Sequence, residues 1–234
     1  MKMFEPLERR KKVYEEVADE IRERILSHKL NLDERLPSER NMAEQFGISR
    51  VAVRESIRIL ELTGFVVVKN GVKGGVFVAQ EYDRPLINSI RNMVRAGEVS
   101  VDDMFTVRLL IEPHAAATVA ENRSTDGLAR LHKTIDIARD AAGKNESLRP
   151  LNFRFHRQIV QLSGNAILRA VGETNLTTLV EALSDIPSDL ISAQHLAFHR
   201  SILDAIDAGD AVTSERLMIE DIQMLRERTL EFIA

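Results

Sequence analysis

The apolar positions of the first eighty residues predict three helices followed by a β-hairpin. One helix is expected over residues 11–29, where apolar residues recur at every fourth position among charged ones. The next two helices are expected over "ERNMAEQF" and from Ser49 to about Thr63. The period then changes, because "FVVVKNGVKGGVFV" holds two β-branched runs around a glycine-rich turn. Asn70-Gly71 suits the tip of such a hairpin.

Capping residues mark where these helices begin and end. Ser38 and Ser49 stand where an N-cap is expected, and Gly47 and Gly64 stand where a left-handed stop is expected. The order is therefore helix, helix, turn, helix and two-stranded hairpin. This is the order of a winged helix-turn-helix.

Beyond residue 80 the strand pattern disappears and helical periodicity dominates. "EYDRP" is a linker in composition, and the breaks further on carry caps at Ser100, Ser124 and Asn165. Helices are expected over residues 86–97, 101–121, 125–143, 148–163, 165–184, 190–208 and 211–232. The prediction is a mainly α protein: a winged helix-turn-helix domain (1–80), a linker (81–86) and an all-α helical-bundle domain (87–234).

Composition and charge are consistent with two domains that have different partners. Residues 1–80 carry 15 Lys/Arg against 13 Asp/Glu, whereas residues 81–234 carry 17 against 23. The chain has no cysteine, which excludes disulfides and thiolate metal sites. No apolar run approaches the roughly 20 residues that span a membrane, and "MKMFEPLERRKK" lacks the apolar core of a signal peptide. A cytoplasmic protein without membrane contact is expected.

The third helix of the front domain carries residues suited to DNA. Arg50 and Arg54 are four positions apart and project from one face, and Arg58 continues the row, while Val53 and Ile57 point to the core. Arginine binds both phosphate and guanine through two parallel hydrogen bonds. A solvated helix face is the alternative interpretation.

The stretch "LPSERNMAEQFGISRVAVRESIRILELTGFVVVKNGVKGGVFV" closely resembles the DNA-binding domain of GntR-family bacterial transcription regulators, over residues 11–79. The resemblance implies a homodimer on a short palindromic operator of double-stranded DNA. It implies contacts at Arg40, Arg50 and Arg54 and at the tip of the hairpin. The full set of expected DNA contacts is Arg40, Ser49, Arg50, Arg54, Lys69, Asn70, Gly71 and Lys73.

Three later segments, "FTVRLLIEPHAAATVAENRS", "FRFHRQIVQLSGNAIL" and "HRSILDAIDAGDA", resemble the helical ligand-binding domain of the FadR subfamily. Many members of this subfamily bind a divalent metal through an Asp and three His. The pattern falls on Asn152, His156, His199 and Asp221, so this chain departs from it at the first and last positions. Two imidazoles and one carboxylate could hold Zn²⁺, Ni²⁺ or Mn²⁺. A polar pocket that binds the effector without metal remains open.

Two neighbouring groups complete the candidate site. The resemblance suggests that Arg108 points at a small carboxylate effector, such as an organic or sugar acid. An intrahelical ion pair with Glu112, four residues later, is the alternative. His195 has no counterpart in the ligand pattern and is expected to be solvated or to stand behind the ligands. "HLAFH" lacks the glutamate of a zinc peptidase.

These features predict a DNA-binding transcription regulator whose operator affinity is controlled by the effector. A repressor is the expected form, and the sequence leaves activation open as the alternative. It is not expected to be an enzyme. Two alternatives are a metal-dependent hydrolase tethered to nucleic acid and an architectural DNA-binding protein without effector. The sequence does not identify the effector, the operator or the dimer interface.

Overall fold

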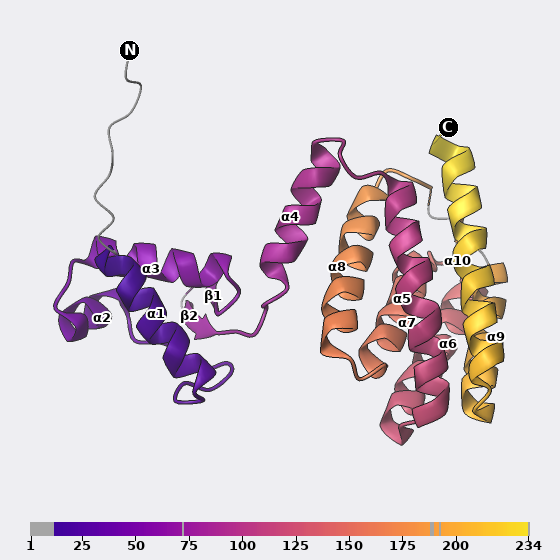
Figure 1. Ribbon diagram of the computed structural model, residues 1–234, viewed down its shortest axis with the longest axis horizontal. Helices are drawn as coiled ribbons and strands as arrows, with labels where there is room; N and C mark the ends of the chain where they lie inside the picture. The colour runs from indigo at the N-terminus through magenta and orange to yellow at the C-terminus, as the bar shows by residue number, and fades with distance from the viewer. Residues whose placement is uncertain (1–11, 72, 188–189, 192, 234) are drawn as a thin grey trace, which may run out of the picture. The chain divides into compact units, whose positions relative to one another are not determined.

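The computed structural model describes residues 12–71, 73–187, 190–191 and 193–233 (Figure 1). The chain divides into two compact units, Met1–Pro85 and Leu86–Ala234. Lys11, where the first helix was predicted to start, and Val72 in the predicted hairpin lie outside the described residues.

The N-terminal unit contains three helices and a hairpin in the predicted order. They are α1 (Val13–Leu26), α2 (Glu39–Phe46), α3 (Arg50–Leu62), β1 (Val66–Lys69) and β2 (Gly75–Val78). Three predicted caps are confirmed. The hydroxyl of Ser38 accepts a hydrogen bond from the Asn41 amide at 3.2 Å, and that of Ser49 accepts one from the Ala52 amide at 3.1 Å. Gly47 ends α2 at φ +65°, a conformation that a side chain would strain.

The hairpin is antiparallel, with Val66 opposite Val78 and Lys69 opposite Gly75. A third segment joins it, which the apolar pattern did not reveal. The Leu36 amide donates to the Val76 carbonyl at 2.8 Å, and the Val78 amide donates to the Glu34 carbonyl at 2.9 Å. The Arg35 guanidinium also donates to the Gly74 carbonyl at 2.6 Å. The chain that leaves α1 therefore braces the hairpin from one edge.

Apolar side chains from every element of this unit form one core. Ile21 of α1, Val53 and Leu60 of α3, and Val66 and Val78 of the hairpin are all buried in it. The arginines of α3 lie on the opposite face, because the helix buries only the stripe that contains Val53, Ile57 and Leu60.

Within its described residues, the C-terminal unit is helical throughout, as predicted. Figure 1 shows its longer helices lying alongside one another. Its helices are α4 (Arg84–Arg95), α5 (Val101–Asn122), α6 (Thr125–Gly143), α7 (Arg149–Leu162), α8 (Ala166–Ala182), α9 (Ala193–Ala208) and α10 (Ala211–Ile233). The helix predicted from residue 86 begins at Arg84, inside the predicted linker 81–86. Pro85 explains the shift, since proline is tolerated in the first turn of a helix.

The bundle buries an apolar core around α5 that also contains a polar group of side chains. Phe105, Phe155, Ile202 and Met218 are among the fully buried residues. The polar side chains buried with them include Arg108, Glu112, Asn152, His156, His199 and Asp221, each at most 3% exposed. Burying so many polar groups costs free energy unless they are paired, so these side chains are expected to bond to one another.

No helix among the described residues is both long enough and apolar enough to cross a lipid bilayer.

Candidate functional site

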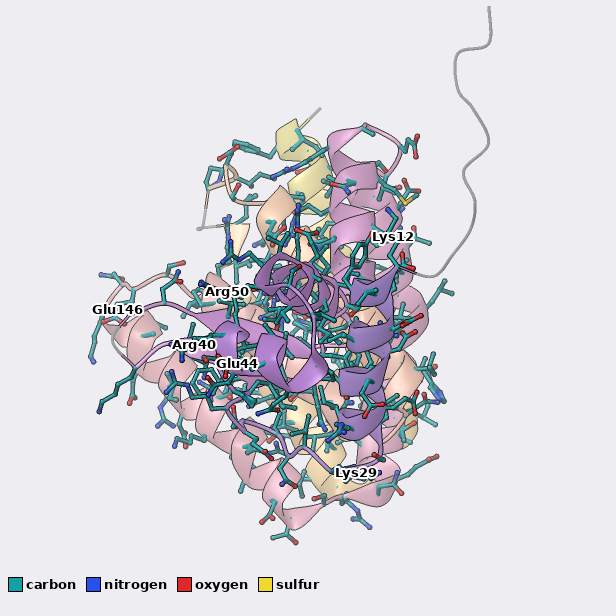
Figure 2. All side chains as sticks on the ribbon, turned by 90° about the vertical axis from the view of Figure 1, so that its left-hand side faces the viewer. Lys12, Lys29, Arg40, Glu44, Arg50 and Glu146 are labelled. Atoms are coloured by element: carbon teal, nitrogen blue, oxygen red, sulfur yellow. The ribbon has the colours of Figure 1, made fainter. Side chains whose placement is uncertain are left out.

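The DNA-facing surface predicted from the sequence is exposed on the N-terminal unit. Arg50, Arg54 and Arg58 of α3 are all exposed. Figure 2 shows Arg40 and Arg50 on one side of the unit, with Glu44 beside Arg40. The Ser49 hydroxyl, a predicted DNA contact, caps α3, and this fixes the start of the helix that presents Arg50.

Two of the predicted DNA-contacting arginines are held by carboxylates. The Arg54 guanidinium donates hydrogen bonds to Glu39, at 2.8 Å from Nη2 and at 3.2 and 3.3 Å from Nε. These hydrogen bonds from Arg54 lower the pKa of Glu39, so the carboxylate stays charged at neutral pH. Arg40 pairs with Glu44 at 3.0 Å across one turn of α2. The structure does not pair Arg50 with any carboxylate among the described residues. DNA phosphates would therefore compete with Glu39 and Glu44 for two of the arginines.

The hairpin tip presents the remaining predicted contacts. Lys69, Asn70, Gly71 and Lys73 are exposed. Lys69 lies over the ring of Phe77, with 4.7 Å between its Nζ and the ring centroid, which steadies the cation at the base of the tip. At Gly75, where φ is +148°, a Cβ atom would stand 2.7 Å from Arg35 Nε, so a side chain there would strain the backbone and displace the bracing arginine. Sequence reasoning missed Arg35.

The four predicted metal-ligand positions converge from three helices inside the C-terminal unit. Asn152 and His156 lie one turn apart on α7, His199 is on α9 and Asp221 is on α10. The Asp221 Oδ2 atom is 3.0 Å from His156 Nε2 and 3.4 Å from His199 Nε2, and the two Nε2 atoms are 3.2 Å apart. The amide of Asn152 stands 3.2 Å from His199 Nε2. The four residues lie up to 69 positions apart in the chain, and the fold brings them together as the resemblance implied.

These spacings fit the edges of a metal coordination shell. Ligand atoms that each lie about 2.1 Å from one ion are roughly 3.0 Å apart in octahedral and roughly 3.4 Å apart in tetrahedral geometry. Two buried oxygens, Oδ1 of Asp221 and Oδ1 of Asn152, have no hydrogen-bond partner among the described residues. Rotating the Asn152 amide by half a turn would aim its oxygen at the cluster, and neutral oxygen and imidazole donors suit Zn²⁺, Ni²⁺ and Mn²⁺. The residues present therefore fit a divalent ion.

Glu112 stands behind His156 and links it to Arg108. Its Oε2 is 2.6 Å from His156 Nδ1, and its Oε1 accepts from Arg108 Nε at 2.7 Å. A hydrogen bond of this kind orients an imidazole when its other nitrogen binds a metal. The ion pair expected as the alternative for Arg108 is present, but Arg108 Nη1 keeps no hydrogen-bond partner among the described residues. The sequence showed Glu112 only as a neighbour of Arg108, because nothing in a linear pattern places it against α7.

The charge on each ionisable group of this cluster depends on its burial and on the charged groups next to it. Burial alone would raise the pKa of Glu112, but Arg108 and His156 outweigh it and lower that pKa to about 2. Burial likewise opposes ionisation of Asp221, yet the two histidines hold its pKa well below the usual range. Burial and Arg108 act against a charged His156, but Glu112 and Asp221 raise its pKa. Burial lowers the pKa of His199, which stays neutral.

His195 is not solvated, which excludes one of its two expected roles. It is 1% exposed and borders a small cavity of about 10 Å³ together with Asn152 and His199. Burial lowers its pKa to about 4, so the ring is neutral at physiological pH. Two other histidines, His114 and His132, are exposed.

Comparison with known proteins matches both halves of the chain to described families. Residues 13–78 match "Bacterial regulatory proteins, gntR family", and residues 103–224 match "FCD domain". The chain is 27% identical over 215 residues to the HTH-type transcriptional repressor NanR of Cronobacter sakazakii, which covers 89% of this chain and 82% of that protein. It is 27% identical over 235 residues to the Uxu operon transcriptional regulator of Escherichia coli K12, which covers 94% of this chain and 87% of that protein.

A solved structure shows the same fold. Streptococcus agalactiae GntR superposes with a TM-score of 0.69 at 25% identity, over 92% of this chain and 100% of that one. The family match excludes the hydrolase alternative. The chain therefore belongs to the GntR family of bacterial regulatory proteins, in the FadR-like subfamily with a C-terminal FCD domain, and it is a DNA-binding transcription regulator, not an enzyme.

Proposed function

We propose that this regulator is a homodimeric repressor that binds a palindromic operator through α3 and the hairpin. The exposed row of Arg50, Arg54 and Arg58 supports base and phosphate contacts in the major groove. The small basic tip around Gly71 suits the minor groove or the adjacent phosphates. NanR is named a repressor, which supports the same role here.

The operator contacts can be tested with an Arg50→Ala, Arg54→Ala double variant. A duplex is first selected from random DNA with the wild-type protein, and binding is then followed by fluorescence anisotropy at several salt concentrations. The double variant is expected to bind at least about tenfold more weakly, and its log–log salt slope should fall by about 2. An Arg216→Ala variant on α10 is the control. Wild-type affinity in the folded double variant would contradict the assignment.

We further propose that the buried cluster of the FCD domain binds a divalent metal and, with it, a small carboxylate. The observation that carries this is the convergence of His156, His199 and Asp221, whose ligand atoms all lie within 4.8 Å of one another in an otherwise apolar core. When bound, the ion would supply a positive centre that holds a carboxylate oxygen. Asn152 would add its amide oxygen.

The charge balance of the cluster favours an anion once the metal is present. Without metal, the charges of Arg108 and protonated His156 offset those of Glu112 and Asp221. Metal binding requires His156 Nε2 to lose its proton, so a divalent ion raises the net charge of the cluster to +1. A monocarboxylate restores neutrality, and Arg108 Nη1 is a free donor for its second oxygen or for a hydroxyl.

The metal is tested by elemental mass spectrometry of protein purified without chelator or nickel resin. About one Zn, Ni or Mn per chain is expected, falling at least about tenfold in a His156→Ala, His199→Ala variant. A His132→Ala variant, which removes an exposed histidine of α6, should keep the metal. If wild type holds no metal even after incubation with each ion, the cluster is a metal-free polar pocket and the metal proposal is wrong.

An architectural DNA-binding protein without effector is the remaining alternative. Such a protein needs no buried cluster of ionisable groups, which costs folding free energy. The acidic second domain also offers DNA no electrostatic attraction. Both observations favour the ligand-responsive regulator.

A further inference from the structure

A second cavity of the FCD domain lies between α4, α5 and α8, apart from the polar cluster. Its volume is about 250 Å³, and it shares no lining residue with the His156, His199 and Asp221 site. Its walls are mostly apolar and include Leu86 and Ile90 of α4, Met104 and Val107 of α5, and Val171 of α8. A cavity of about 150 Å³ with such walls is large enough to bind benzene.

The helix that covers this cavity is underpacked. Apolar residues of α4 fall on one face, at Leu86, Ile87, Ile90, Met93 and Val94. No residue of α4 is buried, although all of them are described. Arg91 ties the helix to Glu181 of α8 with hydrogen bonds of 2.6 and 2.7 Å. Thus Arg91 anchors α4 to α8, while the apolar face of α4 borders open volume.

The polar atoms at the cavity define what kind of molecule it can accept. Thr174 is 2% exposed, lines the cavity, and its hydroxyl has no hydrogen-bond partner among the described residues. A buried hydroxyl without a partner is costly, and a ligand with one hydrogen-bonding group would relieve that cost. Asp103, whose carboxylate accepts from Ser100, also lines the cavity and would repel an anion.

We propose that this cavity is a second ligand site, which takes a small neutral molecule with an apolar body and one hydroxyl or similar polar group. The polar group bonds Thr174, and the apolar body packs between α4 and Val107. This ligand class differs from the carboxylate proposed for the metal cluster. Filling the cavity would stabilise α4, the helix that follows the DNA-binding unit directly in the chain, so the ligand would be coupled to operator binding.

The direct test is calorimetric titration of the full-length protein with octan-1-ol and with sodium octanoate, which share an eight-carbon chain. Octan-1-ol is expected to bind with one site per chain. Octanoate should bind about tenfold or more weakly, because its carboxylate would leave water for an apolar cavity beside Asp103. Equal or tighter binding of octanoate would overturn the proposal, as would no binding of octan-1-ol.

Substitutions that fill the cavity test whether octan-1-ol binds there. Val107→Phe and Val171→Phe each fill the cavity and should weaken octan-1-ol binding about tenfold or more. Val212→Phe, at an exposed valine of α10, is the matched control and should not change it. Thr174→Val should weaken octan-1-ol about threefold but leave toluene, which has no hydroxyl, unchanged. Unchanged octan-1-ol binding in both cavity-filling variants would place the alcohol elsewhere and overturn the proposal.

Two further outcomes separate this site from its alternatives. The His156→Ala, His199→Ala variant should bind octan-1-ol like wild type, so loss of binding there would assign the alcohol to the polar cluster. If octan-1-ol does not bind and the cavity-filling variants change the oligomeric state in sedimentation, a second copy of the chain covers this face and the proposal is wrong.

Discussion

Glu39 restrains one of the arginines that should contact DNA. The hydrogen bonds that it accepts from Arg54 join the start of α2 to the exposed face of α3. A carboxylate in this position both holds the guanidinium and places a negative charge close to where phosphate would lie. The net effect on DNA affinity depends on which of these two roles is larger.

We expect Glu39→Gln to raise operator affinity about threefold, because removing a surface charge near phosphate changes binding by about 1 kcal/mol or less. The measurement is the anisotropy titration on the selected duplex at low salt. Glu220→Gln, which breaks an exposed pair with Arg216 on α10, should have no effect. A weaker complex with Glu39→Gln would show that Glu39 acts by orienting Arg54.

Glu112 is hydrogen-bonded to two buried groups, the guanidinium of Arg108 and the imidazole of His156. Its side chain is 1% exposed, so neither partner could turn to water if the carboxylate were removed. We expect Glu112→Gln to lower the free energy of unfolding by about 3–5 kcal/mol, as for other broken buried pairs. Urea unfolding followed by circular dichroism measures this. Glu220→Gln should cost less than about 1 kcal/mol, and a similar loss in both variants would refute the role given to Glu112.

At the residue scale, sequence reasoning found the four candidate metal ligands but not the residues that support them. The resemblance to the FadR subfamily pointed to Asn152, His156, His199 and Asp221, and the fold brings these four residues together. Glu112 and Arg35 were missed, because each acts on a segment more than thirty residues away with no local pattern. His195 is buried in the fold. The helical periodicity of the sequence did not show that the face of α9 that carries His195 points into the core.

At the element scale, local signals predicted the helices well. Ser38, Ser49, Ser100, Ser124 and Asn165 all cap the helices they were expected to cap. These caps are short-range hydrogen bonds, so they can be identified from a few neighbouring residues. The edge segment at Glu34–Leu36 depends on pairing with distant Val76 and Val78 and left no such signal.

Arg91 anchors α4 to Glu181 of α8. We expect Arg91→Ala to increase hydrogen exchange of α4 amides about three- to fivefold, because it removes the pair with Glu181 and about 1 kcal/mol of local stability. Mass-spectrometric exchange at neutral pH measures this. Arg216→Ala, on α10, should leave α4 unchanged. Unchanged exchange in Arg91→Ala would mean that apolar contacts hold the helix.

Lowering the pH should also increase the hydrogen exchange of the α4 amides in the wild-type protein. The hydrogen bond from Arg91 lowers the pKa of Glu181 below its usual value. The stabilisation is therefore complete above the usual glutamate pKa and is lost as the pH falls through the lowered pKa. Exchange of α4, corrected for the intrinsic rate, should rise over that range in wild type but not in Glu181→Gln. A rise of equal size in both would exclude Glu181 as the titrating group.

At the scale of the whole molecule, the two units divide the work of a regulator. The front unit carries the exposed arginines and a slight positive charge, and the back unit carries the buried cluster and most of the negative charge.

A ligand that binds only the folded back unit must also stabilise it. A metal at about one hundred times its dissociation constant should add about 3 kcal/mol to the unfolding free energy of that unit. Thermal unfolding with and without chelator measures this, and the His156→Ala, His199→Ala variant should show no chelator effect.

The most direct test of the account is whether the buried cluster controls DNA binding. Operator affinity should be measured by anisotropy with the metal found in the protein, alone and with gluconate, malate and citrate as chelating carboxylates. The account predicts that at least one of them weakens operator binding about tenfold or more in wild type, and that none does so in the His156→Ala, His199→Ala variant. An equal response in both proteins, or no response to any carboxylate in wild type, would contradict it.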